Sequence, residues 1–283
     1  MTYREAASLL TAELLVLYDS REASQLSAWV LEEVSGKKKS ERLIAVSQEM
    51  SAEEFQRWNN IKKRLLLGEP IQYVLNQAPF MEWVFFVDST TLIPRPETEE
   101  LVGWVLTDHN SEETLKVLDA GTGSGCIAIA LQLKRPTWKV IGGDISLAAL
   151  ETAQMNAQKY GAELQLMPLN MLDSLKAFRP QNYNLIISNP PYIPLSEQDI
   201  MSNHVTGYEP KDALFVPDEQ PLLFYEALGK AALLHLVTGG MLYVETHQDF
   251  GTAVVELFDQ MGFTTILRKD LQGNDRMVRA VKN

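Results

Sequence analysis

The stretch Val117-Leu-Asp-Ala-Gly121-Thr-Gly123-Ser-Gly125 decides the fold of this chain. A short apolar run, typical of a buried strand, leads directly into three glycines with G-x-G-x-G spacing, and an apolar helix is expected at 126–133. Glycines at such a junction permit a tight turn and let a ligand approach the backbone closely. The spacing differs from the G-x-G-x-x-G of a dinucleotide site, and no Gly-Lys-Ser/Thr of a phosphate-binding loop follows.

Asp144 strengthens the prediction of a ligand at this loop. It follows the next predicted strand, Lys139–Ile141, and a carboxylate at that place can accept hydrogen bonds from both hydroxyls of a ribose. Taken alone, Asp144 is also explained as a residue near the start of a helix, because Ser146 and a helical segment follow. Together, the loop and the acid predict a ribose-containing cofactor. They do not distinguish a nicotinamide cofactor from S-adenosylmethionine.

Strands and helices alternate from Leu115 to the end of the chain. Strands are predicted at 116–118, 139–141, 164–167, 183–188 and 241–245. Helices are predicted at 126–133, 147–160, 222–237 and 250–261. Residues 263–267 and 277–281 are expected to close the sheet as an antiparallel pair. This alternation predicts an α/β fold with a mostly parallel sheet and helices on both faces.

Residues 1–76 lack this alternation and are expected to form a small helical domain. Gln25–Val34 has helical spacing and is followed by Ser35-Gly36, a stop signal. Ser51-Ala-Glu-Glu54 is a capping box for a helix that runs to about Leu67. A further helix is expected at 40–47.

The next segment, 77–93, is rich in β-forming residues and is predicted to be a β-hairpin linker, with Thr90–Ile93 included. Pro94-Arg95-Pro96-Glu97 then stops the strand, and a helix is expected to run to about Leu106. Residues 94–283 are expected to form the larger domain.

Bulk properties narrow the class of protein. The chain has 283 residues, a formal net charge of −12 and a single cysteine, Cys126. One cysteine excludes an internal disulfide and fits a reducing compartment, and the first residues do not resemble a secretory signal. No apolar run is long enough to span a bilayer. We therefore expect a cytoplasmic protein with no membrane association. The acidic balance also argues against stable nucleic-acid binding, which relies on contacts to phosphates.

Leu185-Ile-Ile-Ser-Asn189-Pro-Pro-Tyr192 predicts the chemistry. Two prolines cannot continue a central strand, so the chain must leave the sheet at its ligand-binding edge. This geometry predicts a rigid pair of acceptors, the Asn189 side-chain oxygen and a backbone carbonyl, that of Pro190. A rigid loop that merely ends a strand is the alternative. That alternative is less compatible with the glycine loop and with Asp144 upstream.

Such a pair of acceptors suits a planar amide or amino group, whose delocalised lone pair makes it a poor nucleophile. Acceptors aimed at its two N–H bonds can hold the nitrogen against a methyl donor, and they stabilise positive charge that develops on the nitrogen. Tyr192 is placed to stack on the planar group. The expected reaction is a direct in-line methyl transfer with no covalent enzyme intermediate, and no general base is required.

Asn189-Pro-Pro-Tyr192 downstream of Gly121-Thr-Gly-Ser-Gly125 resembles the signature of class I methyltransferases that act on planar nitrogens. Further segments, over nearly the whole chain, resemble the release factor glutamine methyltransferases (the PrmC/HemK family): Gly68-Glu-Pro-Ile-Gln-Tyr73, Leu92-Ile-Pro-Arg-Pro-Glu-Thr98, Tyr208-Glu-Pro-Lys-Asp-Ala-Leu214 and Gly273-Asn-Asp-Arg276. The resemblance implies a Rossmann-like class I sheet with a small N-terminal helical domain that docks a protein substrate. It also implies S-adenosyl-L-methionine as methyl donor, S-adenosyl-L-homocysteine as product, and the glutamine of the Gly-Gly-Gln motif of peptide chain release factors as substrate.

The resemblance implies a role for each matched residue. Cofactor binding would involve Gly121, Thr122, Gly123, Ser124, Gly125, Asp144, Asn189 and Met171, with Met171 packed against the adenine. The substrate glutamine would be held by Asn189, Pro190, Pro191, Tyr192 and Arg95, of which Asn189, Pro190 and Tyr192 would be catalytic. A salt bridge within the linker explains Arg95 nearly as well, and no metal is expected. The chain departs from the family pattern after Glu245, where it reads Thr246-His247-Gln248 in place of a glycine-rich stretch, and again near Asp218.

Other substrates and a non-catalytic function remain open from the sequence. The same chemistry would serve a glutamine of a ribosomal protein. The Asn-Pro-Pro-Tyr tetrapeptide also suits the amino group of adenine or guanine in a nucleic acid. A binding module that kept the fold but lost catalysis is a third possibility. We expect a monomer whose partner is a release factor.

Overall fold

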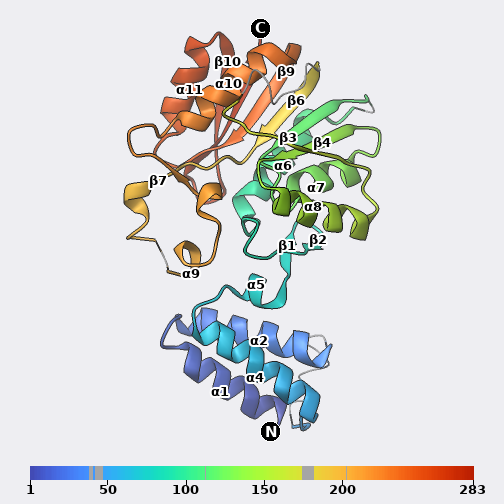
Figure 1. The fold of residues 1–283 in the computed structure, drawn as a ribbon, viewed down its shortest axis with the longest axis vertical. Helices are drawn as coiled ribbons and strands as arrows, with labels where there is room; N and C mark the ends of the chain where they lie inside the picture. The colour runs from blue at the N-terminus through green and yellow to red at the C-terminus, as the bar shows by residue number, and fades with distance from the viewer. Residues whose placement is uncertain (38–40, 42–46, 112, 174–181, 202) are drawn as a thin grey trace. The chain divides into compact units, whose positions relative to one another are not determined.

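The computed structural model describes residues 1–37, 41, 47–111, 113–173, 182–201 and 203–283 (Figure 1). These residues form two compact units. The first comprises Met1–Asn76 together with Ser202–Tyr208, and the second comprises Gln77–Met201 together with Glu209–Asn283.

A mixed sheet of seven strands forms the centre of the second unit. The strands are β3 (Lys116–Ala120), β4 (Lys139–Asp144), β5 (Gln165–Pro168), β6 (Tyr183–Ser188), β9 (Leu236–Glu245), β10 (Phe263–Lys269) and β11 (Asp275–Lys282). They lie in the order β10-β11-β9-β6-β3-β4-β5. The pairs from β5 to β9 are parallel, whereas β11 runs antiparallel to both of its neighbours. The predicted α/β sheet with its antiparallel closing pair is confirmed.

Helices cover both faces of this sheet (Figure 1). They are α6 (Pro96–Asp108), α7 (Cys126–Lys134), α8 (Leu147–Tyr160), α10 (Leu223–His235) and α11 (Gly251–Gln260). Successive strand residues point to opposite faces. Val117 accordingly packs in the core that contains residues of α6, α7 and α8, and Leu118 packs in the core that contains residues of α10 and α11.

The functional segments gather at one edge because the central strands are parallel. Strands β3, β4, β6 and β9 end at Ala120, Asp144, Ser188 and Glu245, and each is hydrogen-bonded to its neighbour in parallel register. In an open α/β sheet this carboxyl edge is where ligands bind. The fold therefore brings the glycine loop, Asp144 and Asn189 to the same edge.

Four described helices build the first unit around its own core: α1 (Tyr3–Leu14), α2 (Ser20–Ser35), α4 (Ala52–Leu66) and α5 (Ile71–Leu75). The predicted capping box at Ser51 is confirmed, and Gly36 ends α2 in the left-handed conformation. Helix α2 begins at Ser20 rather than at Gln25, because the Asp19 side chain accepts hydrogen bonds from the first-turn amides. The helix expected at 40–47 falls mostly outside the described residues.

A segment from far along the chain completes the first unit. It contains α9 (Asn203–Thr206) and ends at Tyr208. His204 stacks on Tyr18 with ring centroids 4.7 Å apart, and His204 Nδ1 lies 2.7 Å from the Gly68 carbonyl oxygen. The Tyr208 hydroxyl donates to the Leu67 carbonyl at 2.9 Å. Sequence spacing offered no sign of this association, because its partners lie more than a hundred residues apart.

The predicted hairpin is shorter than expected. Strands β1 (Ala78–Phe80) and β2 (Trp83–Phe85) pair antiparallel, but Thr90–Ile93 forms no strand. The amide of Thr91 donates to the Asp88 carbonyl within a turn, and that of Ile93 donates to the Glu209 side chain. These backbone donors are satisfied without a partner strand, so the β-forming residues there do not extend the hairpin.

Several short elements were not predicted. They include α5 and α9, the parallel pair β7 (Ile193–Pro194) and β8 (Phe215–Val216), and the single turns η1 (Leu195–Glu197) and η2 (Lys211–Ala213). Among the described helices, none combines the length and the apolar character needed to cross a bilayer.

Candidate active site

A cavity of about 430 Å³ opens at the carboxyl edge of the sheet in the second unit. Of the residues predicted from the sequence to form the site, it is lined by Arg95, Gly121, Thr122, Gly123, Ser124, Asp144, Met171, Asn189 and Pro191. Gly125, Pro190 and Tyr192 lie next to this lining in the chain. Apolar residues of β8 and α10, such as Phe215 and Phe224, also line the cavity. The cavity thus combines the residues expected to bind cofactor with those expected to hold a substrate.

The glycine loop is fastened to the sheet by hydrogen bonds. Gly121 and Thr122 both donate from their amides to the Gly143 carbonyl, at 2.8 and 2.9 Å. The Thr122 hydroxyl donates to Asp119 Oδ2 at 2.6 Å, and the amide of Ala128 donates to the same oxygen. Burial raises the pKa of Asp119 to about 7, and these two donors oppose that rise. The loop is therefore held to β3 and β4 by backbone and side-chain hydrogen bonds.

Gly125 ends this loop in a conformation that only glycine adopts without strain. Its φ is +81°, and a Cβ at this position would lie 3.1 Å from Ala153 Cβ and 3.3 Å from Ala153 Cα. Gly161 has a similar φ of +65° but open space around the corresponding Cβ position. Substituting each glycine by alanine therefore compares the cost of backbone strain alone, at Gly161, with the cost of strain plus crowding, at Gly125.

We expect Gly125→Ala to lower the free energy of unfolding by about 2–4 kcal/mol, from left-handed backbone strain and from crowding against α8. Gly161→Ala, which meets only the backbone strain, should cost about 1 kcal/mol. Urea unfolding of the two variants beside the parent protein measures both values. Equal losses in the two variants would show that α8 yields to the added methyl group.

Asp144 is oriented by two backbone amides. Oδ2 accepts from Gly123 N at 2.8 Å and Oδ1 accepts from Ser146 N at 2.9 Å. Burial raises the pKa of this carboxyl, and the backbone donors at Ser146, Gly123 and Ile145 oppose the rise. A carboxylate has about four acceptor positions, so two remain for the hydroxyls of a ligand.

Met171 lies against the glycine loop. Its Cε is 3.3 Å from the position that a Cβ on Gly121 would occupy, and the Ser188 hydroxyl contacts its sulfur at 3.7 Å. A flexible thioether adapts well to a flat apolar ligand. This placement supports the expected contact with an adenine ring, which remains a prediction.

Asn189, which lines the cavity, and Tyr192 are each held by a side-chain hydrogen bond. Asn189 Nδ2 donates to Thr98 Oγ1 at 3.0 Å, and the Tyr192 hydroxyl donates to Glu245 Oε1 at 2.9 Å. The ring of Tyr192 lies edge-on to that of His247. Stacking of Tyr192 on a substrate remains a prediction, and the observed contacts instead show its hydroxyl bonded to a buried carboxylate.

Arg95 forms the salt bridge that was the alternative to substrate contact. Its Nη2 lies 2.5 Å from Glu209 Oε1, and Glu209 Oε2 accepts from the amide of Ile93 at 3.1 Å. Arg95 also lines the cavity, so the ion pair fixes its position at the rim. In the part of the chain that the structure describes, no group of three His, Cys, Asp or Glu residues could hold a metal ion.

Thr98, Glu209 and Glu245 were not assigned roles from the sequence. Glu245 offered a signal, because an acid that ends a strongly apolar central strand must be buried at the ligand edge. Thr98 and Glu209 stood within matched segments but carried no signal of their own. Their importance depends on contacts that only the folded chain provides.

Comparisons with known proteins agree with this arrangement. The family model described as "Methyltransferase small domain" matches residues 103–206, and the model described as "PrmC N-terminal domain" matches residues 4–75. The chain is 37% identical to the release factor glutamine methyltransferase of Flavobacterium psychrophilum, over 93% of each chain. It is 39% identical to the enzyme of the same name from Enterococcus faecalis, over 89% of this chain and 90% of the other. A methyltransferase structure from Pyrococcus furiosus, 16% identical, shares the fold with a TM-score of 0.53 over 80% of this chain and 99% of the other.

Proposed function

Because this chain belongs to the release factor glutamine methyltransferase family, we propose that it transfers a methyl group from S-adenosylmethionine to the side-chain amide nitrogen of a glutamine in peptide chain release factors. The target would be the glutamine of the Gly-Gly-Gln motif. The observation that carries the proposal is the position of Asn189. Asn189 lines the same cavity as the glycine loop and Asp144, at the carboxyl edge of the parallel strands.

The residues of the cavity fit S-adenosylmethionine. Gly123 faces open space where a side chain would otherwise project, which suits close approach of a ligand to the backbone. Asp144 retains acceptor capacity for ribose hydroxyls, and Met171 offers an apolar surface for the adenine. The bound cofactor would supply a methyl group on a positively charged sulfur.

The protein's part in the reaction is to position a weak nucleophile. Asn189 Oδ1 and the carbonyl oxygen of Pro190 would each accept a hydrogen bond from one N–H of the glutamine amide, and together they would hold its nitrogen toward the methyl donor. These acceptors also stabilise the positive charge that develops on the nitrogen. The excess proton leaves to water after transfer, so no residue has to act as a general base.

The first unit would serve as a docking surface for the release factor. It is matched as a separate family module and has its own core, which suits a role in partner choice rather than in chemistry. The names of the curated relatives favour a release factor over a ribosomal protein. We further propose that the enzyme is a cytoplasmic monomer.

Mass spectrometry of a purified release factor, incubated with this enzyme and S-adenosylmethionine, tests the proposal. We expect a single added methyl group, located on the glutamine of the Gly-Gly-Gln peptide. A release factor in which that glutamine is replaced by asparagine is the matched control and should gain no mass. If the cofactor binds but the glutamine stays unmodified, ribosomal proteins and nucleic acids become the next substrates to test.

A further inference from the structure

A chain of hydrogen bonds connects the site asparagine to a buried carboxylate. Asn189 Nδ2 donates to Thr98 Oγ1 at 3.0 Å, and the Thr98 hydroxyl donates to Glu245 Oε2 at 2.7 Å. Asn189 follows β6, Thr98 lies in the first turn of α6, and Glu245 ends β9. Thr98 is 3% exposed and Glu245 is 1% exposed, so water does not compete for these bonds.

The direction of each bond follows from the donors available. An ionised carboxylate only accepts, so Glu245 takes the single hydroxyl proton of Thr98. Its other oxygen is occupied by the Tyr192 hydroxyl at 2.9 Å. With its proton committed to Glu245, Thr98 can only accept from Asn189. The side-chain amide must therefore present its NH₂ to Thr98 and its oxygen in the other direction.

We propose that Thr98 and Glu245 are positioning residues that set the orientation of the Asn189 amide, so that Oδ1 rather than Nδ2 faces the substrate. The inference rests on the proposed function, because an acceptor is needed only if the substrate brings N–H bonds. A flipped amide would present a donor to another donor. Thr98 and Glu245 thus decide whether the site can hold an amide nitrogen at all.

The segment Gly273-Asn-Asp-Arg276, which the proposed function does not use, supports the ionised form of Glu245. Burial raises the pKa of Glu245, as does nearby Glu97, while the Thr98 and Tyr192 hydrogen bonds and the positive charge of Arg276 oppose the rise. A protonated Glu245 could donate to Thr98 and reverse the whole chain of bonds. A fixed positive charge beside Glu245 therefore preserves the direction.

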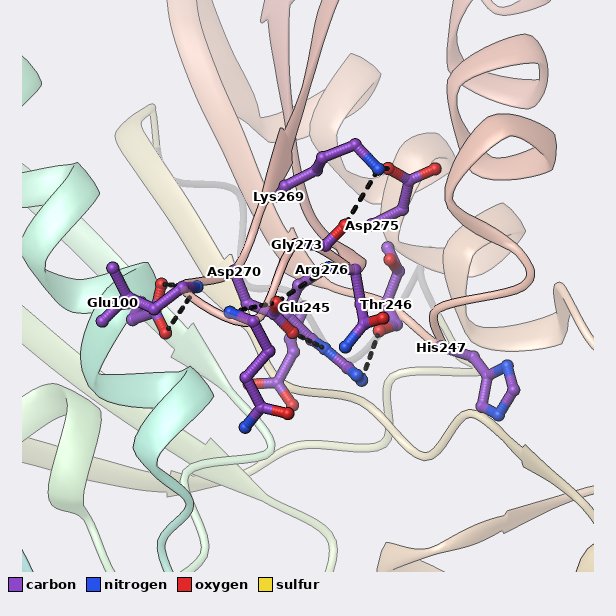
Figure 2. Close-up of polar contacts among 12 residues, drawn as sticks. Glu100, Glu245, Thr246, His247, Lys269, Asp270, Gly273, Asp275 and Arg276 are labelled. Atoms are coloured by element: carbon purple, nitrogen blue, oxygen red, sulfur yellow. Dashed lines mark hydrogen bonds and ion pairs between the residues drawn. The ribbon is translucent and has the colours of Figure 1, made fainter.

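Figure 2 shows how Arg276 is held in place. Its Nε pairs with Asp270 Oδ2 at 3.3 Å and its Nη1 donates to the Thr246 carbonyl at 3.2 Å. Asp270 in turn accepts from the amides of Gln272 and Asn274 at 2.9 Å, which closes the turn between β10 and β11. The guanidinium is thus anchored on two sides.

The first part of the test removes the Thr98 hydroxyl, which links Asn189 to Glu245. We expect Thr98→Val, which keeps the shape but loses the hydroxyl, to lower kcat on the release factor by on the order of 10- to 100-fold. Thr98→Ser should stay within about threefold of the parent protein, because it keeps the hydroxyl. The affinity for S-adenosylmethionine should be unchanged in both. Thr107→Val, on the exposed part of the same helix, is the matched control and should keep full activity.

Reversing the direction of the bonds is the sharper part. In Glu245→Gln the new amide can accept from Tyr192 and donate to Thr98, so Thr98 would donate to residue 189 and flip the Asn189 amide. We expect a kcat at least about 10-fold lower, with little change in Tm. In Asn189→Asp, the single hydroxyl proton of Thr98 would lie between two carboxylates, at positions 189 and 245, and could bond to only one of them. Tm should therefore fall by about 4 °C or more.

Combining Glu245→Gln with Asn189→Asp should restore a consistent set of bonds. In this double variant the new amide at position 245 donates to Thr98, and Thr98 donates to the new carboxylate at position 189, whose other oxygen again faces the substrate. We expect Tm to return close to the parent value and kcat to exceed the product of the single effects by about 10-fold or more. A role confined to general packing predicts additive effects instead.

The two readouts separate this inference from the proposed function. Additive changes in Tm and kcat, or a fully active Thr98→Val, would overturn the orienting role while leaving the enzyme's function intact. A parent protein that fails to methylate release factor would instead overturn the function. Coupling in Tm would still support the orienting role in that case, because Tm requires no substrate.

Discussion

Asn189→Ala is expected to lower the rate of methyl transfer by about 1,000-fold, while S-adenosylmethionine still binds with near-normal affinity. The substitution removes the side-chain acceptor expected to work beside the backbone carbonyl of Pro190. The glutamine amide of the substrate then has a single hydrogen-bond acceptor. Its nitrogen is no longer oriented toward the methyl donor, and the positive charge that develops on it is less stabilised. The glycine loop and Asp144, which are proposed to bind the cofactor, follow or end other strands, and their hydrogen bond should persist.

Single-turnover rates with release factor, beside calorimetric titration with S-adenosylmethionine, measure the two parts of this expectation. Asn184→Ala is a suitable control, because Asn184 lies on the same strand at its other end, where it accepts from the Lys116 amide. That variant should lose some stability but little activity. An Asn189→Ala enzyme with the parent rate would remove Asn189 from the mechanism.

Asp144→Ala is expected to weaken S-adenosylmethionine binding by about 100-fold, since each hydrogen bond to a charged group contributes about 1.5–3 kcal/mol. Loss of the carboxylate removes the two acceptor positions left for a ribose. It also leaves the amides of Gly123 and Ser146 without the carboxylate acceptor that, in the parent protein, holds the glycine loop and the start of α8. Both effects act on the cofactor rather than on the chemical step.

Calorimetric titration separates these effects from a general loss of charge. Glu151→Ala removes the same charge from the exposed face of α8 and should leave the dissociation constant unchanged. At saturating cofactor, Asp144→Ala should recover most of its kcat. A normal dissociation constant in this variant would assign the ribose to another residue.

The sheet could be predicted because its signals are local. β6 and α8 have the predicted bounds, since an apolar run and a capped helical pattern each depend on neighbouring residues. The edge that collects Gly121, Asp144 and Asn189 follows from parallel pairing alone. These features needed no knowledge of distant contacts.

The contacts that orient the site could not be predicted in this way. Thr98 meets Asn189 across 91 positions of the chain and Glu245 across 147. A threonine in the first turn of a helix looks like an ordinary capping residue until its partners are known. The prediction of a strand at Thr90–Ile93 was wrong for a related reason. The distant Glu209 carboxylate accepts from the Ile93 amide, so that amide needs no partner strand.

The segment that carries His204 and Tyr208 has a consequence for exchanging parts between relatives. Since this segment belongs to the helical unit, that unit is discontinuous in the gene. A chimera that swaps only residues 1–76 would place a foreign Gly68 region against the native His204 and Tyr208. Recombination that preserves these contacts has to take 202–208 from the same parent as the first 76 residues. If the helical unit docks the release factor, as proposed, its specificity would be inherited as two separate stretches of sequence.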